Sequence, residues 1–181
     1  MNIVLIGYRC CGKTTVGRLL ARDLEREFLD TDRLIEGKTG LPIHSHVSQN
    51  GWRDFRAVER EVVEEIASKD NVVIATGGGA VIDQENVSNL RKNGWVVWLH
   101  TNTPVIRDRM KKGQKSGEWR PSLSGADPVK EIDRILHERM PVYERASDYR
   151  VDTNGQNPEE VEQVIIRALP QWHKSNIAGG Y

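Results

Sequence analysis

The chain has 181 residues, a length typical of one domain with a substantial hydrophobic core. Its 26 Lys and Arg residues balance its 26 Asp and Glu residues, so it lacks the overall positive field that favours nucleic-acid binding. No apolar run approaches the roughly 18 residues that a membrane span needs. We therefore expect a cytoplasmic protein with neither a nucleic-acid nor a membrane partner.

The two cysteines, Cys10 and Cys11, are adjacent in the chain. Adjacent Cα atoms lie about 3.8 Å apart, which is below the usual disulfide range of about 4.4 Å or more. Neighbouring cysteines also lack the spacing of metal ligands. The sequence therefore predicts two free thiols.

Residues 7–14 read G-x-x-x-x-G-K-T, the pattern of a phosphate-binding loop. An apolar run from Ile3 to Ile6 precedes this pattern, as a buried parallel strand should, and apolar residues at helical spacing follow it. A strand, a glycine-rich loop and a helix N-terminus in this order form an anion site, because free backbone N–H groups and the helix dipole face the ligand. The alternative is a chance match, and the flanking strand and helix argue against it.

This loop supplies the candidate nucleotide-binding residues. Lys13 is placed to contact the β- and γ-phosphates of ATP, and the Thr14 hydroxyl to ligate Mg²⁺. The residues expected to contact the nucleotide are Gly7, Cys10, Cys11, Gly12, Lys13, Thr14 and Thr15.

Strand-like and helix-like segments alternate after the loop. Strands are predicted at residues 28–32, 72–76, 95–99 and 149–152. Helices are predicted at residues 33–38, 54–69, 83–93, 128–140 and 158–169, and one more begins with Thr103 as N-cap and Pro104 in its first turn. The signal is poor between residues 41 and 51.

Such alternation predicts an α/β domain over residues 1–170, with helices on both faces of a parallel sheet. Ligands of such sheets bind beyond the C-terminal ends of the strands. Three polar clusters follow strands in this chain: the glycine loop, Asp30 with Asp32, and Gly77–Gly79. We expect these clusters to converge on one cleft.

Two segments fall outside the alternation. Residues 111–127 combine glycine, serine and charged residues without a period, and a loop of this length inside a compact domain is often functional. Glycines, lysines and a central arginine, Arg120, suit a lid that closes over phosphate and excludes water. A surface loop without function is the alternative. Residues 171–181 are expected to form a flexible tail.

Asp30 and Asp32 end the second predicted strand. Phosphoryl transfer depends on positioning and charge neutralisation, and Asp30 is suitably placed to help hold Mg²⁺, directly or through water. If the strand continues through Asp32, both side chains lie on one face, where Asp32 could orient the proton of an acceptor hydroxyl. The alternative is a structural corner with Asp32 as a helix N-cap.

The residue pattern alone leaves other candidates open. The triplet Gly77–Gly79 would let the backbone approach a ligand closely, but a tight turn is the alternative. Arg139 precedes Pro141 at the predicted end of a helix, where the helix dipole stabilises a cation. The pattern likewise fixes no role for Arg56 or Arg120.

Taken in order, the motifs of this chain resemble those of shikimate kinases. They are the phosphate loop, FLDTD at 28–32, DFRxxE at 54–59, GGGAV at 77–81, RP at 120–121, ERMPVYERAS at 138–147 and VDTN at 151–154. Each motif is weak alone, but together they run from the first strand to the last helix. The resemblance implies a three-layer α/β/α P-loop kinase fold of the nucleoside-monophosphate-kinase-like group, with a five-stranded parallel sheet in the order 2-3-1-4-5.

The resemblance also implies an activity. A shikimate kinase transfers the γ-phosphoryl group of ATP to the 3-hydroxyl of shikimate, in chorismate and aromatic amino-acid biosynthesis, with Mg²⁺ as cofactor. The implied catalytic residues are Lys13, Asp32 and Arg120, and the implied metal site contains Thr14 and Asp30. We expect a monomer whose partners are the small molecules ATP and shikimate.

The substrate contacts are implied in the same way. Arg56 and Arg139 resemble the clamp on the shikimate carboxylate, and Glu59 resembles the support of Arg56. Gly78 and Gly79 resemble backbone contacts to shikimate, beside Asp32. On the nucleotide side, the implied contacts are the lid residue Arg120, Arg109, and the loop at Asn157 and Pro158.

Three residues depart from the family pattern. Cys10 stands where a glycine is common, Trp52 where an acid often follows the glycine, and Ser122 where a leucine usually follows the lid Arg-Pro pair. The departure at Cys10 concerns the detailed geometry of the loop. None of the three is a motif acid or arginine, so the predicted activity stands.

Two other functions are compatible with the phosphate loop. Another small-molecule P-loop kinase, such as a gluconate or nucleotide kinase, would not account for Asp32, Arg56 and the triple glycine together. A GTPase-type switch protein would carry an N-K-x-D guanine-binding motif, which the sequence lacks.

Overall fold

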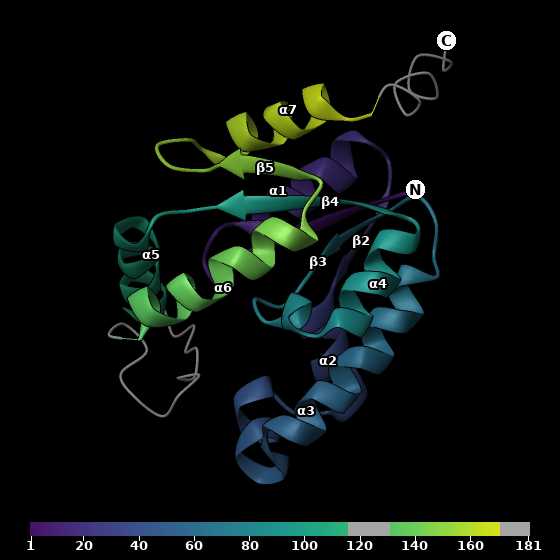
Figure 1. The fold of residues 1–181 in the computed structure, drawn as a ribbon, viewed down its shortest axis with the longest axis vertical. Helices are drawn as coiled ribbons and strands as arrows, with labels where there is room; N and C mark the ends of the chain where they lie inside the picture. The colour runs from purple at the N-terminus through teal and green to yellow at the C-terminus, as the bar shows by residue number, and fades with distance from the viewer. Residues whose placement is uncertain (116–130, 171–181) are drawn as a thin grey trace.

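The protein is described by a computed structural model that covers residues 1–115 and 131–170. Its strands are β1 Asn2–Ile6, β2 Glu27–Asp30, β3 Val72–Ala75, β4 Gly94–His100 and β5 Tyr149–Asp152. They pair in parallel in the order β2-β3-β1-β4-β5 (Figure 1), which confirms the predicted fold and strand order.

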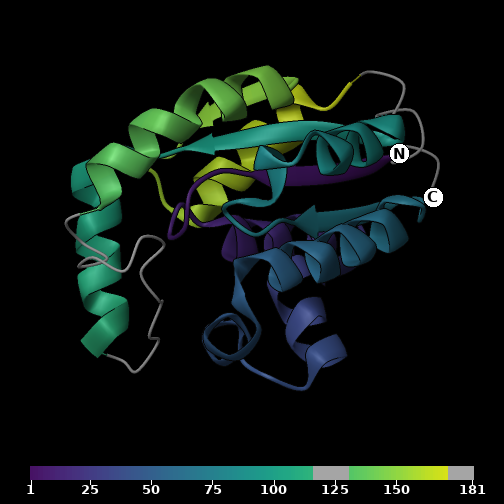
Figure 2. The ribbon, with the colours of Figure 1, turned by 60° about the horizontal axis from the view of Figure 1, so that its bottom comes forward.

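The helices of the described residues alternate with these strands. They are α1 Lys13–Asp23, α2 Thr31–Thr39, α3 Ile43–Ala67, α4 Gln84–Lys92, α5 Thr103–Lys115, α6 Ile132–Ala146 and α7 Pro158–Ala168, with a short 3₁₀ turn at Ala80–Ile82. Within the described ranges, no helix has the length and apolar character to cross a membrane. Figure 2 shows α5 and the first part of α3 as two separate projections from the layered core.

Successive residues of β1 face opposite helical layers, because strand side chains alternate. Ile3 and Leu5 belong to a core with Leu20 of α1 and Ile165 of α7. The intervening residues, Val4 and Ile6, belong to a second core with α3, α4 and α6. The apolar run of β1 is therefore buried on both faces, as expected of a central parallel strand.

The second predicted strand is too long by two residues. Strand β2 ends at Asp30, and the Asp30 carboxylate accepts hydrogen bonds from the N–H groups of Asp32 and Arg33 as the N-cap of α2. Asp32 therefore lies in the first turn of a helix, and strand alternation does not relate it to Asp30. The capping residue is Asp30, so the alternative of Asp32 as N-cap is also wrong.

Helix α3 starts eleven residues before the predicted helix at 54–69, at Ile43. Gly51, with φ 83° and ψ 168°, interrupts its helical backbone between two helical segments. A small third core of Ile35, Phe55 and Val62 joins α3 to α2. The break at Gly51 explains the poor signal over residues 41–51, because the helical segment before it is too short to show a clear helical period.

The helices on either side of the predicted lid also differ from prediction. The side chain of Asn102 accepts a hydrogen bond from Val105 N at 3.2 Å, so Asn102, not Thr103, caps α5. Helix α5 continues to Lys115, which makes residues 111–115 of the predicted lid helical. The remainder of the lid and the tail at 171–181 lie outside the described residues.

Helix α6 contains Pro141, where the predicted helix ended. Proline costs one backbone hydrogen bond of a helix, but Tyr143 and Ala146 beyond it are buried and extend the apolar face of α6. Arg139 is therefore in the middle of a helix, and its interpretation as a helix-terminal charge is wrong.

Candidate active site

One cleft of about 930 Å³ lies beyond the C-terminal ends of β1, β2 and β3. Residues 9–15 of the phosphate loop, Asp30 with Asp32, and Gly77–Gly79 line it, as predicted, whereas Gly7 is not among the lining residues. Arg109 and Pro158 line the same cleft as the phosphate loop, and Arg56 and Arg139 line it beside the glycines. The sheet thus brings together residues from seven separate parts of the chain.

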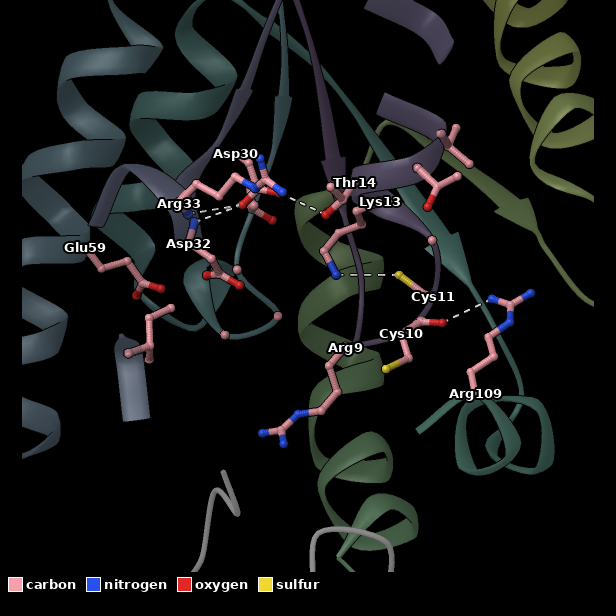
Figure 3. A pocket seen from close by; sticks show the side chains of 18 of the residues that line it. Arg9, Cys10, Cys11, Lys13, Thr14, Asp30, Asp32, Arg33, Glu59 and Arg109 are labelled. Carbon is pink, nitrogen blue, oxygen red and sulfur yellow. Dashed lines mark hydrogen bonds between the residues drawn. The ribbon is translucent and has the colours of Figure 1, made fainter. Parts of the chain in front are cut away.

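The Lys13 ammonium is enclosed by its own loop. Its side chain is buried, and Nζ donates hydrogen bonds to the carbonyl oxygens of Gly7 and Tyr8, each at 2.8 Å. Figure 3 shows Nζ directed across the loop toward Cys11, whose Sγ lies 3.6 Å away. A buried cation in a loop that leads into a helix N-terminus is the charge arrangement expected of a phosphate site.

Cys10 has a φ of 61°, in the left-handed region that favours glycine. Its carbonyl oxygen accepts a hydrogen bond from Arg109 Nη1 at 3.1 Å, so the strained residue is also anchored to α5. The loop geometry at Cys10 thus accounts for the glycine that is common at this position. Both Cys10 and Cys11 are free thiols, as predicted.

The Thr14 hydroxyl lies at the start of α1 and donates to Asp30 Oδ2 at 2.8 Å. This contact joins the phosphate loop to the end of β2 (Figure 3). Asp32 lines the cleft from the first turn of α2, and a Cβ at Gly77 would lie 2.6 Å from Asp32 Oδ1. A side chain at residue 77 would therefore displace the Asp32 carboxylate.

Arg56 extends from α3 into the cleft between aromatic and acidic neighbours. Its guanidinium donates to the carboxylate of Glu59 and lies 5.2 Å from the ring centre of Phe55 and 5.5 Å from that of Trp52. Burial raises the pKa of the Glu59 carboxyl, and the Arg56 charge opposes that rise. A Cβ at Gly79 would lie 2.6 Å from Arg56 Nη2, so a side chain at residue 79 would displace this guanidinium.

Side chains hold the glycine triplet by hydrogen bonds at Gly77 and Gly78. The N–H of Gly77 donates to Thr31 Oγ1 at 2.7 Å. The carbonyl oxygen of Gly78 accepts from Arg139 Nη1 at 3.0 Å and from the Tyr143 hydroxyl at 2.6 Å. The triplet therefore connects α2 to α6 and brings Arg139 to the same part of the cleft as Arg56.

Comparison with known proteins identifies the family. The family model described as shikimate kinase matches residues 9–170. The chain belongs to the shikimate kinase family. Among its relatives, the shikimate kinase of Moorella thermoacetica is 43% identical over 174 residues, which cover 96% of this chain and 97% of the relative. That of Thermodesulfovibrio yellowstonii is 42% identical, with coverage of 92% and 93%.

Solved structures of shikimate kinases have the same fold. The Acinetobacter baumannii enzyme in complex with shikimate matches with a TM-score of 0.84 and 36% identity, covering 97% of this chain and 93% of that one. The Aquifex aeolicus enzyme matches with a TM-score of 0.77 and 33% identity, with coverage of 99% and 100%. A gluconokinase from Sinorhizobium meliloti shares the fold at 18% identity, with a TM-score of 0.58 and coverage of 99% and 97%.

The predicted nucleotide contacts of this family member divide into three groups. Arg109 and Pro158 line the cleft. The Asn157 side chain instead caps α7 by accepting from Glu160 N at 2.8 Å, and Asn157 is not among the residues that line the cleft. Arg120 lies outside the described residues.

Several residues of the shikimate kinase cleft were not predicted from the sequence. Arg9, Trp52, Phe55, Thr153 and Gln156 line the cleft without a predicted role. Trp52 had a detectable signal, because it replaces the acid that is common at its position. Tyr143, which is not among the residues that line the cleft, also had one, since it belongs to the RMPVY motif that Arg139 begins.

Proposed function

We propose that the chain catalyses transfer of the γ-phosphoryl group of ATP to the 3-hydroxyl of shikimate, giving ADP and shikimate 3-phosphate. The observation that carries this proposal is the single cleft that holds a phosphate loop, Asp32, and two arginines from distant helices. Membership of the shikimate kinase family supports the same acceptor. The reaction belongs to the biosynthesis of chorismate and the aromatic amino acids.

The nucleotide binds at the phosphate loop in this proposal. Lys13 neutralises charge on the β- and γ-phosphates, and the backbone N–H groups of the loop at the start of α1 bind phosphate oxygens. Arg109 and Pro158 border the nucleotide's base. Arg120 closes over the transferred phosphoryl group from the lid.

Mg²⁺ fits the oxygens of Thr14 and Asp30, because this hard cation prefers oxygen ligands. Across residues 1–115 and 131–170, no group of three or more His, Cys, Asp or Glu side chains is arranged to hold a metal ion. The remaining ligands are then ATP phosphate oxygens and water, as is usual for Mg²⁺ at nucleotide sites. When bound, the ion neutralises developing charge on the phosphoryl oxygens.

The acceptor binds beside the glycine triplet. Arg56 and Arg139 bind its carboxylate, since guanidinium groups form paired, charge-assisted hydrogen bonds with carboxylates. Asp32 then orients the acceptor hydroxyl and accepts its proton as the phosphoryl group is transferred. Because the carboxylate is fixed at one end of the ring, only one hydroxyl faces Asp32.

An ADP-release assay tests the proposal. We expect Mg-ATP to be consumed with shikimate and much more slowly with gluconate, other sugars and nucleotides. A faster reaction with gluconate or a nucleotide would show that this compound, and not shikimate, is the acceptor. No ADP release with any acceptor, despite nucleotide binding, would favour a nucleotide-dependent regulatory protein.

A further inference from the structure

The Gly78 carbonyl oxygen accepts two hydrogen bonds from one helix, and the catalytic roles proposed above account for only one of the donors. Arg139 and Tyr143 are four residues apart on α6, and both donate to this oxygen, at 3.0 Å and 2.6 Å. Arg139 faces the acceptor side of the cleft. Tyr143 is 1% exposed and is not among the residues that line the cleft.

Tyr143 is built into the core as a fixed donor. Its ring packs against Trp98 of β4 with the ring centres 5.9 Å apart. Burial raises the pKa of the Tyr143 hydroxyl above its usual range. The group therefore stays protonated at physiological pH and donates to the carbonyl throughout.

Fixing the Gly78 carbonyl also fixes the next amide. In a trans peptide the C=O and the following N–H point in opposite directions, and the described chain has no cis peptide bonds. Holding Gly78 O against α6 therefore turns the Gly79 N–H away from α6. A peptide between two glycines has little conformational preference of its own, so its orientation depends on such external hydrogen bonds.

The shared carbonyl also orients Arg139. A guanidinium carries five N–H donors in a planar arrangement, and one donor is used on Gly78 O. That contact sets the plane in which the remaining donors meet a ligand. If the Gly78 carbonyl rotates, Arg139 loses the hydrogen bond that orients its guanidinium. The Gly78–Gly79 peptide changes its orientation at the same time.

We infer that Tyr143 is a positioning residue for the acceptor: its hydroxyl holds the Gly78 carbonyl so that Arg139 and the Gly78–Gly79 peptide are aligned for a carboxylate-bearing substrate. This inference rests on the proposed function, because shikimate is the ligand that the aligned groups would bind. It assigns Tyr143 no contact with substrate.

The variant Tyr143→Phe tests the inference, because phenylalanine keeps the ring against Trp98 and removes only the hydroxyl. We expect the KM for shikimate to rise about five- to tenfold, the range of one lost hydrogen bond. The Kd for ATP measured without shikimate should be unchanged. Tyr149→Phe is the matched control, because Tyr149 stacks on Trp95 in the core on the opposite face of the sheet from Tyr143 and Trp98.

A double-mutant cycle with Arg139→Lys separates positioning from general destabilisation. If both side chains act through the Gly78 carbonyl, the double variant loses less kcat/KM than the product of the two single losses. Independent, multiplicative losses would overturn the inference. So would an unchanged KM in Tyr143→Phe when the wild type phosphorylates shikimate. Absence of wild-type turnover with shikimate would instead overturn the proposed function.

Discussion

Arg56 and Glu59 lie one turn apart on α3, and the guanidinium of Arg56 donates a hydrogen bond to a Glu59 carboxylate that is 1% exposed. Glu59 thus orients an arginine that two aromatic rings also contact. Because the carboxylate is buried, its orientation is set by the arginine and its protein neighbours.

Replacing Glu59 by glutamine should weaken acceptor binding without affecting the nucleotide. The neutral amide keeps the volume but loses the charge-assisted hydrogen bond, so we expect the KM for shikimate to rise about tenfold. Steady-state kinetics with either substrate varied would measure this. Glu61→Gln is the control, because Glu61 is exposed and pairs with Lys38. An unchanged shikimate KM in Glu59→Gln would mean that the Glu59 carboxylate does not contribute to acceptor binding by Arg56.

Asp32→Asn tests the proposed proton acceptor. An amide cannot accept the proton of the acceptor hydroxyl, so kcat should fall by about a hundredfold or more, within the range of acid–base groups. The thermal midpoint and ATP affinity should change little. Asp108→Asn is a suitable control, since the Asp108 side chain is exposed on α5. Near-normal turnover of Asp32→Asn would exclude the assignment.

The sequence predicted the cleft because three polar clusters follow strands that end at one edge of a parallel sheet. The strand order was implied by the resemblance to shikimate kinases. Prediction from the sequence failed at boundaries where a local contact overrides periodicity. The Asp30 carboxylate begins α2 two residues before the predicted end of the strand. Helix α6 passes through Pro141 because buried residues beyond it outweigh one missing hydrogen bond. Tyr143 escaped prediction because its role depends on a carbonyl 65 residues away in the chain.

The backbone at Cys10 predicts opposite effects for two substitutions. A left-handed conformation costs a non-glycine residue about 1–2 kcal/mol, whereas glycine adds about 0.5–1 kcal/mol of unfolded-state entropy. Cys10→Gly should therefore be neutral or stabilise the fold by up to about 1 kcal/mol. Cys10→Val, with a β-branched side chain, should destabilise it. Urea unfolding of both variants measures this, and greater stability of Cys10→Val than of Cys10→Gly would contradict the argument.

Glu162 makes stability depend on pH. Burial raises the pKa of the Glu162 carboxyl, and the nearby Asp23 raises it further. A hydrogen bond from Arg22 lowers the pKa of Asp23, so Asp23 remains ionised. Because the folded state favours protonated Glu162, its contribution is most favourable below the unfolded pKa of about 4.3 and is lost as pH rises through the higher folded pKa.

The variant Glu162→Gln removes this titration. Its thermal midpoint should exceed that of the wild type by an amount that grows as pH rises from about 4 to 7, because only the wild type then buries a new charge. Glu64→Gln, at an exposed position of α3, is the control variant. A wild type that gains stability relative to Glu162→Gln over this range would show that the carboxylate is favourable in the fold.

The two arginines of the acceptor site predict how the enzyme recognises a carboxylate. Lysine keeps the charge of Arg56 or Arg139 but cannot reproduce the planar, paired donors. We expect Arg56→Lys and Arg139→Lys each to lower kcat/KM for shikimate by at least about tenfold, or about 1.4 kcal/mol, with ATP affinity maintained.

The shikimate analogue with its carboxylate reduced to an alcohol provides the decisive comparison. It should be a very poor substrate of the wild type, because the guanidinium donors then have no carboxylate to bind. Each substitution should then harm the analogue far less than it harms shikimate, since the lost interaction was with the carboxylate. Equal penalties for the two substrates would show that Arg56 and Arg139 maintain the structure of the cleft and do not bind the carboxylate.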